Sequence, residues 1–147
     1  MTEDEMRLRV AVDALLAEFC WRIDRNGGVG VADLFMPDGR LIVPGKPGAP
    51  DDVFEGRDAI AARWAGRPPT IVTRHVYTNL RVLQQSDSRA EAQSIGLGFR
   101  HEGRGLGVTV PLVISDFDDR LERDASGTWH FAERRITLIF ADPSFGA

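Results

Sequence analysis

Two residues of the sequence, Asp24 and His75, have side chains suited to acid–base chemistry. An imidazole titrates near neutral pH, and a carboxylate on its other ring nitrogen fixes the tautomer and stabilises the imidazolium. Asp24 falls in the last turn of a predicted helix, where the negative end of the helix dipole disfavours a carboxylate by up to ~1 kcal/mol. A protonated imidazole nearby would offset that cost. The residue types alone also allow Asp24 to pair with Arg25 and His75 to be a structural histidine.

The predicted strand that carries His75 has one polar face. Alternation along the strand places four residues on that face: Thr73, His75, Tyr77 and Asn79. A polar face that also carries an aromatic ring is expected to line a cavity. Tyr77 and Asn79 are therefore candidates to hold a developing oxyanion or a leaving group. Asn79 has the alternative of bonding to backbone at the end of the strand.

The N-terminal half predicts three helices. Thr2 and Glu5 fit a capping box, and a helical stripe of apolar residues runs from Leu8 to Ile23. Asn26-Gly27-Gly28 is expected to end this first helix. Residues 31–36 predict a short second helix, followed by a turn at Pro37-Asp38-Gly39 and a strand over 40–43. A third helix is expected over residues 56–65.

The C-terminal half predicts four long strands, over residues 71–83, 90–101, 108–123 and 128–140. Strands of this length are typical of a coiled, half-closed sheet. Helices followed by strands predict an α+β fold. A chain of 147 residues is expected to form one domain, residues 1–147.

Composition disfavours several functional classes. Lys and Arg number 18 against 22 Asp and Glu, and the cations are scattered, so a nucleic-acid partner is not expected. No 18-residue apolar run predicts a membrane span, and the acidic N-terminus does not resemble a signal peptide, so a cytoplasmic location is expected. His75, His101 and His130 lack metal-ligand spacing, and no motif indicates a cofactor.

Five local motifs, in register over residues 5–140, resemble the SnoaL-like branch of the nuclear-transport-factor-2-like superfamily. They are Ile23-Asp24-Arg25, Leu34-Phe35-Met36-Pro37-Asp38-Gly39, Glu55-Gly56-Arg57-Asp58-Ala59-Ile60, Thr73-Arg74-His75-Val76-Tyr77-Thr78-Asn79 and Gly127-Thr128-Trp129-His130-Phe131-Ala132-Glu133-Arg134-Arg135. The resemblance implies a cone-shaped, strongly curved antiparallel sheet, closed by three N-terminal helices around a cavity.

The resemblance also implies roles for the two acid–base residues. In dehydratase and dehydrochlorinase relatives, the aspartate at the position of Asp24 orients a histidine at the position of His75, and that histidine is the general base. Relatives often carry a tyrosine on the first helix, near the aspartate. This chain reads Phe19-Cys20-Trp21-Arg22-Ile23 there. The electrophilic role of that tyrosine is therefore left unfilled. We expect Phe19 and Trp21 to contact the substrate.

The predicted function is a cofactor-free lyase or isomerase that acts on a mostly apolar, cyclic small molecule. Arg120, Arg134 and Arg135 are further candidates to anchor an anionic or carbonyl group, although Arg120 also fits an ion-pair network. The alternatives are a non-catalytic subunit, like the β chain of ring-hydroxylating dioxygenases, and a ligand-binding module. Chain length weighs against the subunit, because such chains are usually longer. A homodimer or homotrimer is expected, through an outer sheet face that includes Val110 and Leu112.

Overall fold

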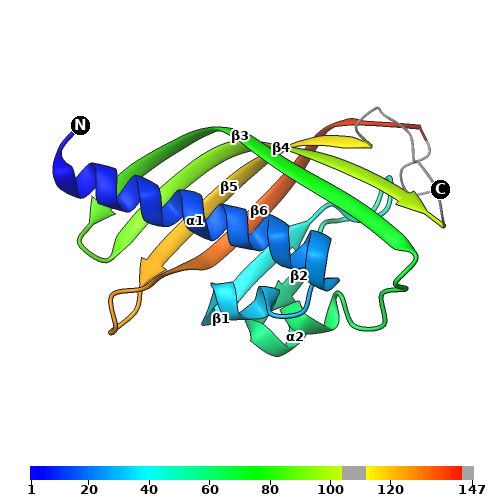
Figure 1. The fold of residues 1–147 in the computed structure, drawn as a ribbon, viewed down its shortest axis with the longest axis horizontal. Coiled ribbons are helices and arrows are strands. Elements are labelled where there is room, and N and C mark those ends of the chain that lie inside the picture. The colour runs from blue at the N-terminus through cyan, green and yellow to red at the C-terminus, as the bar shows by residue number, and fades with distance from the viewer. Residues whose placement is uncertain (104–111, 144–147) are drawn as a thin grey trace.

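The computed structural model describes residues 1–103 and 112–143. A long helix lies across one face of a curved sheet, and a shorter helix covers the sheet near one end (Figure 1). In chain order the elements are α1 (Glu3–Asn26), a 3₁₀ turn (Val31–Leu34), β1 (Phe35–Val43), β2 (Asp52–Glu55), α2 (Gly56–Ala62), β3 (Ile71–Ser86), β4 (Arg89–Glu102), β5 (Val113–Arg123) and β6 (Trp129–Ala141).

The ends of α1 are formed as the sequence predicts. The Thr2 hydroxyl accepts a hydrogen bond from the Glu5 backbone N–H, and the Glu5 carboxylate accepts one from the Thr2 backbone N–H. Gly27 ends the helix with a φ of 60°, in the left-handed region that glycine adopts without strain. The last turn, which carries Asp24, is therefore held at a defined place.

In the part of the chain that the structure describes, six strands form a single open sheet in the order β2-β1-β6-β5-β4-β3. Neighbouring strands are antiparallel except for β1 and β6, which pair in parallel. The prediction of a purely antiparallel sheet is therefore wrong at this pair. Strand β2 was not predicted at all. It is only four residues long and, as an edge strand, pairs with β1 alone.

The expected second helix over residues 31–36 is also wrong. Only Val31–Leu34 forms a 3₁₀ turn, and Phe35 already begins β1, where it pairs with Phe131. The structure thus has two α-helices within the described residues, not three. Pro37-Asp38-Gly39 bulges out of β1, since five residues advance from Phe35 to Arg40 while β6 advances two from Phe131 to Glu133. The predicted turn is a bulge inside a longer strand.

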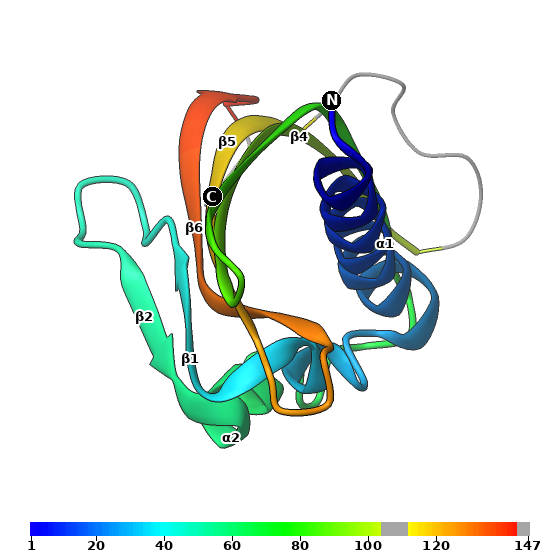
Figure 2. The same cartoon turned by 90° about the vertical axis from the view of Figure 1, so that its left-hand side faces the viewer.

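The sheet curves around α1, so that α1 packs on its concave side (Figure 2). The core between them includes Leu16, Phe19, Phe35 and Phe131, all at most 3% exposed. The first and third predicted helices and the four long predicted strands agree with the structure to within a few residues, apart from the part of residues 108–123 that precedes the described segment. No helix in residues 1–103 or 112–143 is long and apolar enough to span a membrane.

The strand register aligns four apolar residues in one row across β3, β4, β5 and β6: Val76, Leu97, Ile114 and Phe140. By alternation this row lies on the face opposite His75. At its two ends, Val76 is 49% and Phe140 67% exposed. Val110 and Leu112 were expected on this outer face. Val110 lies outside the described residues, and Leu112 lines the cavity described below instead.

Self-association through this row stays a prediction. At micromolar concentration the protein is expected to sediment as a homodimer or homotrimer, and Phe140→Asp to shift it toward monomer, because a charge would be buried at the contact. Val10→Asp is the matched control, since Val10 is 69% exposed on α1. Sedimentation velocity of the three proteins checks this. A monomeric wild-type protein would contradict it.

Candidate functional site

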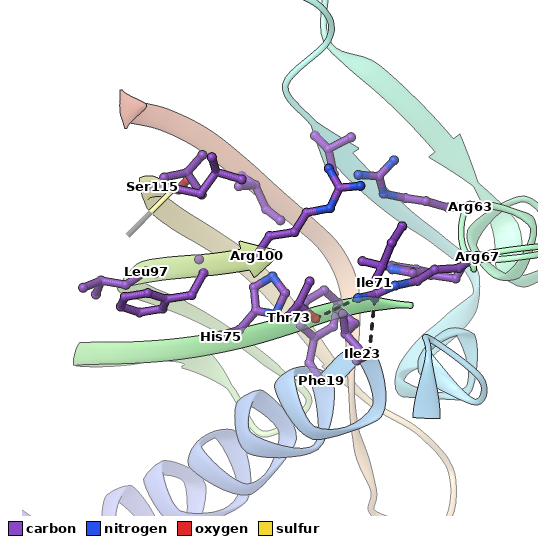
Figure 3. A pocket seen from close by; sticks show the side chains of 18 of the residues that line it. Phe19, Ile23, Arg63, Arg67, Ile71, Thr73, His75, Leu97, Arg100 and Ser115 are labelled. Carbon is purple, nitrogen blue, oxygen red and sulfur yellow. Dashed lines mark hydrogen bonds between the residues drawn. The ribbon is translucent and has the colours of Figure 1, made fainter. Parts of the chain in front are cut away.

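A cavity of about 490 Å³ opens between the concave sheet face, the end of α1 and the turns that follow α2. This volume lies in the range that holds a small organic molecule. Apolar side chains form much of its wall, including Phe19, Ile23, Trp64, Phe117 and Ile136. His75 projects into it from β3, close to Thr73 (Figure 3).

Two glycines of β4 keep space open beside His75. A Cβ on Gly98 would lie 2.9 Å from a methyl group of Val113 and 3.9 Å from Cδ2 of His75. A Cβ on Gly96 would overlap the ring of Phe117, at 2.1 Å. Larger residues at either inward position would fill the cavity or displace its wall. The glycines thus have a packing role in shaping the cavity.

Asp24 and His75 are in direct contact, as predicted. The Asp24 carboxylate comes from the last turn of α1, and its Oδ1 lies 2.6 Å from the ring Nδ1 of His75. Oδ2 accepts a second hydrogen bond, of 2.7 Å, from the His75 backbone N–H. Because an ionised carboxylate can only accept, this contact places hydrogen on Nδ1 and leaves Nε2 with its lone pair free. Nε2 has no hydrogen-bond partner within the part of the chain that the structure describes.

The environment of Asp24 favours its ionised form. Burial raises the pKa of this carboxyl, since the side chain is only 7% exposed, but hydrogen bonds from the His75 ring and backbone, and then the charge of His75 and the Thr73 hydroxyl, outweigh it. The net pKa of Asp24 is lowered from its usual value. The carboxylate therefore stays charged at neutral pH, which suits a group that orients an imidazole.

Thr73 and Arg67 complete a chain of hydrogen bonds behind the histidine. The Thr73 hydroxyl donates to Oδ1 of Asp24 at 2.8 Å and accepts from Arg67 at 2.9 Å. Arg67 also donates to the backbone carbonyl of Ile23 at 3.3 Å, which ties the segment after α2 to the end of α1 (Figure 3). Strand alternation predicted Thr73 on the same face as His75, but no sequence pattern predicted a role for Arg67. Its neighbours Gly66 and Pro68 indicated only the end of a helix.

Tyr77 and Asn79 were expected to line the cavity beside His75, but neither does. The Tyr77 hydroxyl donates to the backbone carbonyl and carboxylate of Asp13, both at 3.1 Å, and burial, followed by the hydrogen bond to Asp13, raises the pKa of Tyr77 to about 12. Asn79 lies in a bulge between Thr78 and Arg81, with a φ of 55°, and is exposed. The bulge ends the simple alternation. Both residues line a second, shallow depression, which His75 also borders.

Of the two aromatic residues expected to contact substrate on α1, only Phe19 lines the cavity. Trp21 is 56% exposed, and the guanidinium of Arg25 lies 5.1 Å from its ring centre. Two positions along a helix differ by about 200°, so Phe19 and Trp21 point to nearly opposite sides. The structure therefore places Trp21 outside the cavity, whereas Phe19 lines it.

The arginines proposed from the C-terminal strands lie elsewhere. Arg120 and Arg135 form ion pairs with Glu133 and Asp51 at 3.0 and 3.5 Å. Arg134 is fully buried beneath the cavity, 3.2 Å from Asp119. A second pair of the Asp–His type, Asp124 and His130 at 2.8 Å, belongs to the hairpin between β5 and β6 and does not line the cavity.

Asp124 is organised by its turn instead. It accepts hydrogen bonds from Ser126 and Thr128, and these, Ser126 first and then Thr128 and His130, lower its pKa. This pair therefore holds a hairpin. Within residues 1–103 and 112–143, no three His, Cys, Asp or Glu side chains gather in a way that suits a metal ion.

Several solved structures share this fold. A candidate scytalone dehydratase from Novosphingobium aromaticivorans has a TM-score of 0.80 and 19% identity over 97% of this chain and 91% of that one. The β subunit of a candidate aromatic-ring-hydroxylating dioxygenase from the same organism has a TM-score of 0.78 and 17% identity, over 95% and 94%. At these identities the likeness shows the fold alone.

A Catenulispora acidiphila protein, solved in complex with S-DNPA, has a TM-score of 0.72 and 26% identity over 90% of this chain and 94% of that chain. A search of curated protein sequences finds no match. The SnoaL-like domain family matches residues 4–135. The chain belongs to the SnoaL-like family.

Proposed function

We propose that this protein is a cofactor-free lyase or isomerase that removes a proton from a carbon next to an activating group of a mostly apolar, cyclic molecule. His75 is the general base and Asp24 its orienting partner. The observation that carries the proposal is the 2.6 Å contact between Oδ1 of Asp24 and Nδ1 of His75, at the wall of a cavity. A candidate scytalone dehydratase and a ketosteroid isomerase-like protein among the structural neighbours are consistent with this class.

In the proposed reaction, Nε2 of His75 takes the proton while negative charge develops on the activating carbonyl. The imidazolium that forms lies against the Asp24 carboxylate, which stabilises it. The developing oxyanion needs a hydrogen-bond donor. The Tyr77 hydroxyl already donates to Asp13, so it is not available for this role. The side-chain donors on the described part of the cavity wall include the Ser115 hydroxyl, the indole N–H of Trp64 and the guanidinium groups of Arg63, Arg67 and Arg100. The departing group, or a second carbon, then receives the proton back.

The wild-type protein tests the reaction class directly. A panel of cyclic ketones and cyclic β-hydroxy ketones is incubated with it in D₂O, and proton NMR follows deuterium entry next to the carbonyl and loss of water. Exchange above the buffer rate is expected for at least one compound. A panel with no exchange would argue for a binding module.

The dioxygenase β-subunit alternative rests on one specific observation. That β chain is covered to 94% by this chain, so length does not separate this chain from that subunit. A non-catalytic subunit needs a partner but no free base in a cavity. Catalytic exchange by the isolated, purified protein therefore separates the alternatives.

A further inference from the structure

Three arginines line the open end of the cavity, and no acidic residue lines the cavity among the described residues. Arg63 and Arg67 come from the turns that follow α2, and Arg100 comes from β4. Figure 3 shows Arg63 and Arg100 reaching toward each other across the opening, with Arg67 beside them. Residues from two distant parts of the chain thus bring three positive charges to one place.

Arg63 and Arg100 form no ion pair and no side-chain hydrogen bond within residues 1–103 and 112–143. Burial lowers the pKa of Arg63, and the more distant Asp52 carboxylate raises it without contacting the guanidinium. Other arginines of the sheet, such as Arg40 and Arg120, each lie within 3.2 Å of a carboxylate oxygen. Arg63 is held by stacking instead, with its guanidinium 5.4 and 5.7 Å from the ring centres of Phe54 and Trp64. The N–H groups of Arg63 are therefore held beside these rings, and none of them donates a hydrogen bond to a described residue.

The backbone fixes this cluster. Trp64 packs on Gly28, where a Cβ would lie only 2.1 Å from the indole ring, so the segment after α2 sits against the end of α1. Arg67 is anchored on Ile23 and Thr73. The charges also act on one another: burial lowers the pKa of Arg67, and although Asp24 raises it, the nearby Arg100 lowers it. A bound anion would relieve this repulsion.

We propose that the natural ligand of the cavity is an acid: a cyclic, mostly apolar molecule with one oxyanion group, of the carboxylate type, held by Arg63 and Arg100 beside Arg67. The ring system lies against Phe19, Phe117 and Ile136, and the oxyanion remains at the open end. A planar guanidinium matches a carboxylate in two parallel hydrogen bonds, which also fixes orientation. This deepens the proposed function and rests on the same cavity being the ligand site.

Matched pairs of compounds test the proposal without any turnover. The probes are 2-naphthoate, cyclohexanecarboxylate and benzoate, each compared with its neutral carboxamide of nearly the same shape, by isothermal titration calorimetry. At least one acid is expected to bind about tenfold or more tightly than its amide, as charge-assisted hydrogen bonds allow. The preference is expected to shrink as salt is raised, because the arginines are partly exposed.

Variants assign that preference to the cluster. Arg63→Gln and Arg100→Gln are each expected to remove most of the preference for the acid over its amide. Arg67→Lys keeps the positive charge at that position but lacks the planar guanidinium. Arg74→Gln is the matched control, because Arg74 neighbours His75 on β3 but faces the other way and bonds its own strand at the Thr73 carbonyl. Equal binding of every acid and amide, no binding by any acid, or an undiminished preference in the Arg63→Gln/Arg100→Gln double variant overturns the proposal.

The binding test and the catalytic test fail separately. His75→Ala is expected to retain the preference for the acid, because His75 does not belong to the arginine cluster. If the acid is preferred but no compound exchanges protons, the proposed reaction fails and the ligand class stands. If protons exchange but acid and amide bind alike, the reaction stands and the ligand class fails.

Discussion

Replacement of His75 by alanine is expected to reduce turnover by about 10²–10⁴, the contribution of a positioned proton-transfer group. The domain is expected to stay folded, because the His75 side chain is 29% exposed and its backbone N–H still reaches Asp24. The measurement is the initial rate of exchange or elimination on a compound that the wild-type protein turns over, with circular dichroism as the folding check.

The second Asp–His pair supplies the control. His130→Ala removes an imidazole that lies 2.8 Å from Asp124 but lines no part of the cavity, so the rate is expected to stay within about twofold of the wild-type rate. A folded His75→Ala protein with full activity would exclude the mechanism. An equal loss in the two variants would point to a general effect of losing a histidine.

Asp24→Asn is expected to harm the rate nearly as much, through the tautomer of His75. The His75 backbone N–H can only donate, so it selects the amide oxygen for the position of Oδ2. The amide nitrogen then faces Nδ1, which must accept, and the ring hydrogen moves to Nε2. An imidazole with hydrogen on Nε2 cannot act as the base there. Asp24→Glu, which restores the charge with altered reach, is expected to recover part of the activity.

Acid stability gives Asp24 a second measurable signature. Its pKa is lowered in the folded state, so the carboxylate stabilises the fold above the unfolded value, near 3.8. This contribution is lost as pH falls through the lower, folded pKa. Asp24→Asn is therefore expected to lower the free energy of unfolding at neutral pH, and the difference from the wild-type protein is expected to shrink only as pH falls into the acid range.

The parts of the site that local patterns determine could be predicted from the sequence. The cap residues of α1 and the alternation of β3 up to Tyr77 depend on neighbours in sequence, and they place Asp24 and His75 correctly. Phe19 belonged to the apolar stripe of α1 and does line the cavity. Trp21 is two positions from Phe19, which corresponds to about 200° around the helix, so the two side chains point to nearly opposite sides.

The parts that depend on tertiary contacts could not be predicted. The bulge at Asn79 reverses the alternation of β3 through one residue with a positive φ, and only its partner strand reveals it. The parallel pairing of β1 with β6 joins segments about 90 residues apart. The arginine cluster depends on Trp64 packing against Gly28, a contact that no local pattern indicates.

Replacement of Arg134 by alanine is expected to destabilise the fold by about 3–5 kcal/mol, the cost of breaking a buried pair by removing one partner. Arg134 is 0% exposed, and its guanidinium lies 4.3 Å from the ring centres of Phe19 and Phe117, which both line the cavity. It pairs with Asp119, also fully buried. Arg135→Ala, at an exposed ion pair, is the control and is expected to cost at most ~1 kcal/mol. Urea unfolding curves measure both.

The pH dependence of this loss separates a stranded charge from a simple packing defect. Burial raises the pKa of Asp119 to about 6 although Arg134 opposes it, and removing Arg134 raises it further. Because the folded pKa lies above the unfolded one, Asp119 destabilises the fold as pH rises through this range, and more so without its partner. The destabilisation by Arg134→Ala is therefore expected to be smaller at about pH 5 than at about pH 8. Arg134→Met with Asp119→Leu, which removes both charges, is expected to recover most of the stability at about pH 8. A loss that does not change with pH, or a double variant no more stable than Arg134→Ala, would show that the ring contacts rather than the buried ion pair hold this part of the core.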